Sequence, residues 1–114
     1  MKLDDFIITT QDQPAGYTIS DTLGLVRGNT VRSRNIGSNF LSGLKSIVGG
    51  EISGFTKLIT ESREEAIRRL VEHAKERGAN AVVGMRFITT EVGQTCSEIL
   101  AYGTAVKMEK NTSA

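Results

Sequence analysis

A chain of 114 residues is the common size of a single domain, so we expect one domain over 1–114 with no second core. Its 14 Lys and Arg nearly balance 13 Asp and Glu, and a net charge of +1 gives no general attraction to phosphate backbones or anionic lipid, which argues against a nucleic-acid partner. The sequence has no long apolar run and a single Cys, so we expect no membrane span and no disulfide framework, and a cytoplasmic location.

The first third of the chain is rich in β-branched residues separated by turn residues. Residues 6–10 predict a short strand, which ends where Pro14 and Gly16 supply turn geometry. Residues 17–31 are again typical of a strand. Gly24 and Gly28 interrupt this second run, and they favour a long bent or bulged strand over a straight one.

Two helices are predicted in the middle of the chain. Apolar residues at helical spacing over 39–48 predict a short helix, which Gly49 and Gly50 then stop. A longer amphipathic helix is predicted from about Thr56 to Arg77, followed by a Gly78 suited to the left-handed conformation that ends helices. Its apolar stripe consists of Ile59, Ala66, Ile67, Leu70, Val71 and Ala74.

The last third predicts two strands, over residues 81–90 and about 97–108, and then a polar tail over 109–114. Both strands carry apolar residues on both parities. One parity holds Val82, Ile88, Leu100, Tyr102 and Val106, and the other holds Val83, Met85, Phe87, Ile99 and Ala105. A single long helix covers only one face of a sheet, so the simplest cover for the second face is another copy of the chain.

Four segments carry a family resemblance: residues 47–51, 61–66, 78–87 and 102–106. Together they resemble the signature blocks of the YbjQ-like family of small uncharacterised proteins, over about residues 7–108. The resemblance implies an α+β fold, with a dodecin-like β-α-β-β subunit in which one long helix packs on a small curved sheet. It also implies assembly as a ring, usually a homopentamer, with a domain core over about residues 6–108. Finally, it carries the label of a heavy-metal-binding domain.

The residues do not support that label within one chain. A tight site for zinc or copper needs about three or four Cys, His or carboxylate ligands, and the chain has one His and one Cys with no C-x-x-C pair. His73 is interpreted as a helix-surface residue near the apolar stripe, and Cys96 as a half-buried thiol. We therefore predict no metal ligand, no cofactor and no catalytic residue. A ring could still bring several copies of these side chains together at its axis.

A small anionic ligand is one candidate partner, and the competing interpretation of the same segment, residues 49–54, is a hinge between two helices with contacts to other subunits. The glycine-rich stretch 49–54 precedes a predicted helix, whose first N–H groups favour anions, but it lacks the Gly-Lys-Ser/Thr of a P-loop. The candidate ligand-binding residues are Arg27, Asn29, Glu51 and Arg63, which are polar groups beside glycine turns or at the start of the long helix.

The preferred function is thus a non-enzymatic, ring-forming homo-oligomer that binds a small ligand or partner between subunits. Two alternatives stay open: a metal-binding protein whose site forms only across subunits, and an enzyme that uses the region of Glu51 and Arg63.

Overall fold

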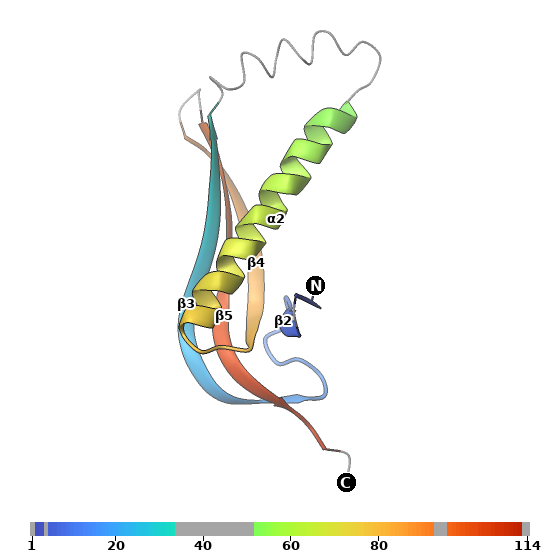
Figure 1. Ribbon diagram of the computed structural model, residues 1–114, viewed down its shortest axis with the longest axis vertical. Coiled ribbons are helices and arrows are strands. Elements are labelled where there is room, and N and C mark those ends of the chain that lie inside the picture. The colour runs from blue at the N-terminus through green and yellow to red at the C-terminus, as the bar shows by residue number, and fades with distance from the viewer. Residues whose placement is uncertain (1, 4, 34–51, 93–95, 113–114) are drawn as a thin grey trace.

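The computed structural model describes residues 2–3, 5–33, 52–92 and 96–112. Its elements in chain order are β1 (Lys2–Leu3), β2 (Phe6–Ile8), β3 (Tyr17–Ser33), α2 (Ile52–Glu76), β4 (Ala81–Val92) and β5 (Cys96–Lys110). The strands form one sheet in the order β1-β2-β4-β5-β3, and α2 packs across one of its faces (Figure 1). The α+β class is therefore confirmed.

The main differences from the sequence prediction concern boundaries. The predicted short helix over 39–48 lies outside the described residues. The long helix starts at Ile52, inside the glycine-rich stretch that was expected to precede it, and the two-residue strand β1 was not predicted. Strand β5 extends to Lys110, beyond the predicted end at 108, because Tyr17 at the start of β3 pairs with Lys110.

The helix forms where the apolar stripe predicted it, and it ends as predicted. Leu70 and Ala74 are fully buried at the centre of the stripe, and Ile59 packs at its border. The chain leaves the helix through Gly78, whose φ is +81°, a conformation in which a side chain costs about 1 to 2 kcal/mol. The Gly78 N–H donates to the carbonyl oxygen of Lys75 at 2.9 Å, which closes the last turn.

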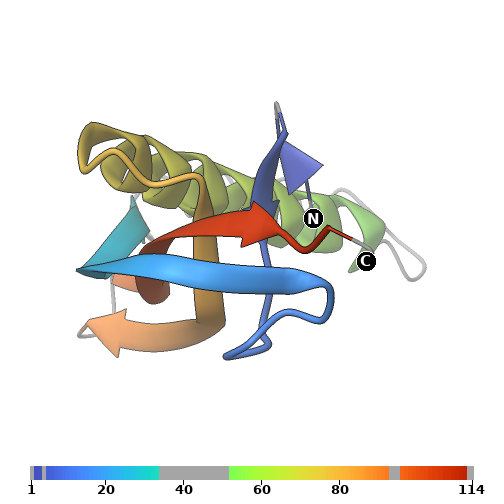
Figure 2. The same ribbon diagram turned by 90° about the horizontal axis from the view of Figure 1, so that it is seen from below.

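Strand β3 is long and bent, as the glycines suggested. Its antiparallel register with β5 shifts twice, between Ile19 and Asp21 and between Thr22 and Gly24. Each shift adds an unpaired residue to β3, and such bulges bend a strand and increase its twist. Seen from below, β3 curves together with β5 under the rest of the sheet (Figure 2).

The helix lies in close contact with the backbone of β3 at Gly28. A Cβ atom at this position would lie 2.1 Å from the carbonyl oxygen of Ala66 and 2.3 Å from the backbone nitrogen of Leu70. Only a residue without a side chain allows α2 to approach the strand this closely. Gly28 was predicted as a bulge residue, but its role is to allow the helix backbone to pack directly against β3.

Because of a bulge in β4, the residues of this strand that share a face differ from the prediction. The register of β4 against β5 shifts between Val83 and Arg86, and Gly84 at the shift has a φ of +61°. Val82 and Met85 both belong to the core under α2, whereas Ile88 pairs with Leu100 on the opposite face. The prediction that Val82 and Ile88 share a face was therefore wrong, because the extra residue reverses the alternation.

The core has two parts, one on each face of the sheet. The larger part lies under α2 and contains residues such as Val26, Leu70 and Ile99. The smaller part lies on the other face at one end of the sheet, and it consists of Ala81, Val83, Val106 and Met108 with Ile7, Tyr17 and Ile19 packed against them. The curl of β3 thus covers part of the second face from within the chain. The rest of this face, called the open face below, is left without an internal cover among the described residues.

Replacing Gly28 by alanine should destabilise the protein by about 3 kcal/mol or more, because the new methyl group overlaps helix backbone atoms and α2 must move away. Urea unfolding measures the loss. Gly16→Ala is the matched control: its φ is +82° but no atom lies within 4 Å, so only backbone strain of about 1 to 2 kcal/mol is expected. An equal or smaller loss for Gly28→Ala would contradict the close approach.

Candidate functional site

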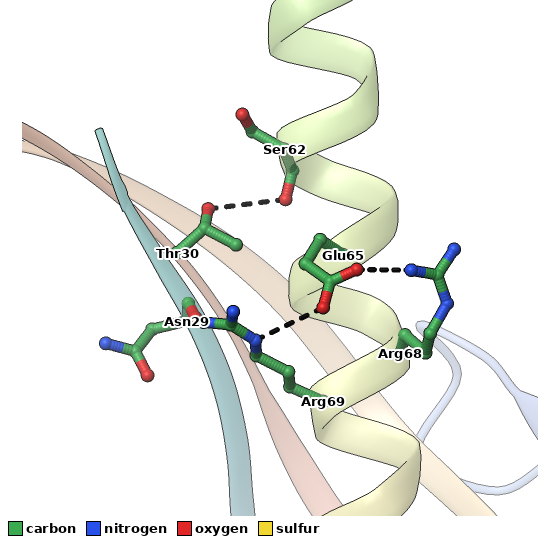
Figure 3. Close-up of polar contacts among 6 residues, drawn as sticks. All are labelled: Asn29, Thr30, Ser62, Glu65, Arg68 and Arg69. Atoms are coloured by element: carbon green, nitrogen blue, oxygen red, sulfur yellow. Dashed lines mark hydrogen bonds and ion pairs between the residues drawn. The ribbon is translucent and has the colours of Figure 1, made fainter. Parts of the chain in front are cut away.

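The structure places three of the four predicted ligand residues. Arg27 and Asn29 are exposed residues of β3, and Arg63 is an exposed residue of α2. Glu51 lies outside the described residues. Thr30 on the other parity of β3 faces the helix, where its hydroxyl donates to the carbonyl oxygen of Ser62 at 3.3 Å. The side chain of Asn29 points to the opposite side (Figure 3).

Arg27 shares this direction with Asn29, because the two residues are two positions apart on one strand. Both side chains therefore lie on the open face, while Arg63 belongs to the helix on the other face. One chain does not bring Arg63 together with Arg27 and Asn29. A site that used all three residues would need a second copy.

Three helix side chains bind the backbone along the outer edge of β3. Arg69, His73 and Arg77 follow one another at intervals of four residues, so they lie in a row on one side of α2. The guanidinium of Arg69 donates to the carbonyl oxygen of Asn29 at 2.6 Å, and that of Arg77 donates to the carbonyl oxygen of Leu23 at 3.3 Å.

His73 lies between them, and its Nδ1 accepts a hydrogen bond from the backbone N–H of Arg27 at 3.1 Å. The same Nδ1 lies 3.3 Å from the carbonyl oxygen of Arg27. In an antiparallel pair, the N–H and C=O of one residue point in the same direction. Both groups of Arg27 therefore point away from β5, toward the edge of the sheet.

These contacts provide hydrogen-bond partners for backbone groups at the edge of β3, which would otherwise be free to pair with another chain. We call Arg69, His73 and Arg77 the edge row. Arg69 is held in place by Glu65, whose carboxylate lies 3.3 Å from the Arg69 Nε and also binds Arg68 (Figure 3). The sequence analysis treated His73 as a helix-surface residue and assigned no role to the two arginines. Their spacing of four beside the apolar stripe was the signal that could have identified them.

The open face carries exposed apolar side chains. Leu25 is 64% exposed, Val31 is 57% exposed and Ile88 is 45% exposed. Pairing across the strands places Ile88 beside Leu100 of β5, which in turn lies beside Asn29 of β3. The open face is therefore a mixed surface, in which apolar side chains surround polar ones.

The polar centre of the open face consists of one cross-strand row and one fixed pair. The register aligns Arg27, Tyr102 and Arg86 across three neighbouring strands. Next to this row, the Asn29 side-chain amide donates to a carboxylate oxygen of Glu98 at 3.0 Å. Sequence reasoning missed Glu98, because nothing in its neighbourhood along the chain indicates that Asn29 lies beside it.

One guanidinium nitrogen of Arg86 already makes hydrogen bonds within the chain. Its Nη1 donates to the carbonyl oxygens of Thr10 at 3.0 Å and Met85 at 2.9 Å, which ties the segment after β2 to the bulge of β4. No such contact is recorded for the Arg27 guanidinium within the described part of the chain. Arg27 is thus the better placed of the two arginines to meet a ligand.

The geometry gives no support to a catalytic pair of Cys96 and His73. Cys96 pairs with Ser33 at one end of the sheet, whereas the Arg27 backbone that binds His73 pairs with Tyr102, six residues further along β5. Six residues of a strand span about 20 Å. Among residues 5–33, 52–92 and 96–112, no three His, Cys, Asp or Glu side chains gather in a way that could hold a metal ion. No helix in the described ranges is long and apolar enough to cross a membrane.

Comparison with known proteins gives the family. A family model described as "Putative heavy-metal-binding", that of YbjQ, matches residues 6–109. The chain belongs to the YbjQ family. It is 52% identical over 103 residues to the UPF0145 protein DET1617 of Dehalococcoides mccartyi, which covers 90% of this chain and 99% of that protein. It is also 52% identical over 102 residues to the UPF0145 protein VP1283 of Vibrio parahaemolyticus, which covers 90% of this chain and 97% of that one.

A solved structure shares the fold. The crystal structure of a protein with unknown function from Pediococcus pentosaceus, described as a DUF74 family member, superposes with a TM-score of 0.59 at 19% identity. The match covers 91% of this chain and 98% of that chain. At this identity the likeness extends to the fold alone.

We expect that the YbjQ-family chain forms no tight soft-metal site on its own, because one His and one Cys cannot complete a tetrahedral shell and His73 Nδ1 already accepts a hydrogen bond. Titration with zinc, followed by calorimetry, should show no submicromolar site with one ion per chain. Such a site, if lost in His73→Ala or Cys96→Ser, would contradict the expectation. Fewer ions than chains would instead indicate a site shared between copies.

Proposed function

We propose that the protein is a cytoplasmic, non-enzymatic homo-oligomer, assembled as a dodecin-like ring, which binds a small anionic ligand between its subunits. The observation that carries the proposal is the open face of the sheet. Leu25, Val31 and Ile88 expose a third or more of their surface there, whereas α2 and the curl of β3 bury most of the other apolar residues of the sheet.

Exposed apolar residues that stand close together on a sheet favour association. Single exposed apolar residues are ordinary, whereas a contiguous patch of several hundred Å² is typical of an interaction surface. Val31 of β3 and Ile88 of β4 lie on either side of the half-buried Leu100 of β5, and Leu25 lies further along β3, beyond Arg27 and Asn29. A second copy seated on this patch would bury all of them at once.

A ring follows if the surface that covers the open face is a different surface of the neighbouring copy. Such a head-to-tail contact repeats from copy to copy until the rotation closes. The capped edge of β3 supports this choice, because the edge row blocks strand pairing on that side and directs contacts to the open face. The number of copies, five, comes from the resemblance of the chain to its family and not from burial.

The ligand would bind where the polar centre meets the neighbouring copy. Arg27 offers a guanidinium suited to carboxylate or phosphate groups. The pair of Asn29 and Glu98 lies beside it and would restrict the orientation of a ligand. Arg63, on the far side of its own sheet, could reach such a site only from the neighbouring copy. Glu51 keeps its predicted role as a fourth ligand residue.

Light scattering coupled to size exclusion should give a mass near five times 12.3 kDa at both dilute and concentrated loading. Ile88→Asp should lower the mass or make it depend on concentration, because each junction would then bury an unpaired carboxylate. Thr60→Asp, which adds the same charge to an exposed position of α2, is the matched control and should keep the native mass. A folded monomer at every concentration would contradict the assembly proposal.

Native mass spectrometry of the untagged protein tests the ligand. We expect a small anionic molecule to be retained by the wild type and lost in Arg27→Gln, because the guanidinium supplies the charge-assisted bonds. Arg68→Gln, on the exposed surface of α2, should retain it. An unchanged adduct in Arg27→Gln, or a wild type that retains nothing, would count against the proposed ligand while leaving the ring intact.

A further inference from the structure

The central contact of the edge row depends on the protonation state of one ring. We propose that His73 is a pH-sensitive latch, which holds α2 on the edge of β3 through the backbone N–H of Arg27 only while its imidazole is neutral. The inference is independent of the oligomer and of the ligand, because it rests on contacts within one chain.

The latch requires the proton of the neutral ring to lie on Nε2. The N–H of Arg27 points at His73 Nδ1 over 3.1 Å, and a backbone N–H can only donate. We assign Nδ1 as the acceptor of this bond, which places the proton of the neutral ring on Nε2. The opposite tautomer would instead donate from Nδ1 to the carbonyl oxygen of Arg27 at 3.3 Å. A charged imidazolium carries a proton on both nitrogens and cannot accept this bond.

Protonation also provides the ring with an alternative partner. The carbonyl oxygen of Arg27 lies 3.3 Å from the same Nδ1. A protonated Nδ1 would donate to this oxygen, and the N–H of Arg27 would lose its acceptor. Protonation thus exchanges one hydrogen bond between His73 and the strand for another, and the backbone N–H of Arg27 is left without an acceptor.

The charged neighbours of the ring are of both signs. On α2 these are Arg69, Glu72, Glu76 and Arg77, and on β3 the nearest charged residue is Arg27. Strand β5, also packed against α2, contributes Ala101 and Ala105 to the core under the helix, and its Lys107 lies near Gly78 at the end of the helix. Arg69 and Arg77 donate to carbonyl oxygens and are positively charged at any pH of interest, so their contacts do not change on acidification. Histidine is the only residue type in the edge row that can change its charge under mildly acidic conditions.

The first experiment identifies the tautomer. The chain has a single histidine, so the ring signals in a nitrogen-15 NMR spectrum of the full-length protein belong to His73 without further assignment. At about pH 7.5, where a histidine is mostly neutral, we expect Nε2 to carry the proton and Nδ1 to show the shift of an unprotonated nitrogen. A protonated Nδ1 under these conditions would overturn the proposal.

The second experiment measures amide exchange at about pH 5.5 and about pH 7.5, corrected for intrinsic rates, because these values bracket the pH range in which histidine side chains in general change charge. Protection of the Arg27 amide should fall about five- to tenfold at the lower pH, as expected for the loss of one hydrogen bond. The amide of Gly28, which the strand alternation directs toward β5, should keep its protection and serves as the internal control.

His73→Asn separates the latch from other effects of pH. The asparagine Oδ1 occupies the place of Nδ1 and accepts the same bond, but it does not titrate. We expect this variant to protect the Arg27 amide equally at both pH values. Equal protection in the wild type, or the same acid-dependent loss in His73→Asn, would overturn the latch.

Discussion

The close approach of α2 to β3 at Gly28 determines how the two layers of the protein fit together. Because no side chain separates them, the helix backbone lies against the strand that forms one edge of the sheet, and not over its middle. From there α2 covers β3 and β5 and leaves most of β4 uncovered. Phe87, on the same face as the helix, is accordingly 39% exposed, although it is a large apolar residue.

The position of the helix also explains why its polar side chains differ in role. Residues on the side of α2 nearest the edge reach the backbone of β3, where Arg69, His73 and Arg77 replace a missing neighbouring strand. On its outer side, Arg68 instead binds Glu65 of the same helix. The part of the sheet under α2 is therefore closed by packing and the β3 edge by hydrogen bonds, while the open face depends on whatever covers it from outside.

Much of the fold could be predicted from local patterns. The apolar stripe located the helix, Gly78 marked its end, and β-branched runs located β2 to β5. These features depend on neighbours along the chain, which a sequence displays directly. The parity of β4 could not be predicted in this way, because a single bulge at Gly84 reverses the alternation and any glycine in a strand is compatible with several conformations.

The candidate site was less accessible to sequence reasoning, because it depends on the register between strands. Arg27 and Asn29 were identified through their neighbouring glycines, yet their partners Tyr102 and Glu98 are more than sixty residues away and are brought near by pairing with β5. In the same way, His73 looked like a surface residue because nothing along the chain shows that α2 lies at the edge of the sheet.

The order of the strands in the chain has a consequence for synthesis on the ribosome. β3 pairs only with β5, and Thr18 finds its partner Asn111 at a separation of 93 residues, so almost the whole chain must emerge before the strand is paired. α2 emerges much earlier, and its hydrogen bonds with β3 span 32 to 54 residues. Shorter loops close at a lower entropic cost, so the helix can dock on β3 first. Until β5 emerges, the edge row and the packing of α2 at Gly28 would shield the seventeen-residue strand β3 from pairing with other nascent chains.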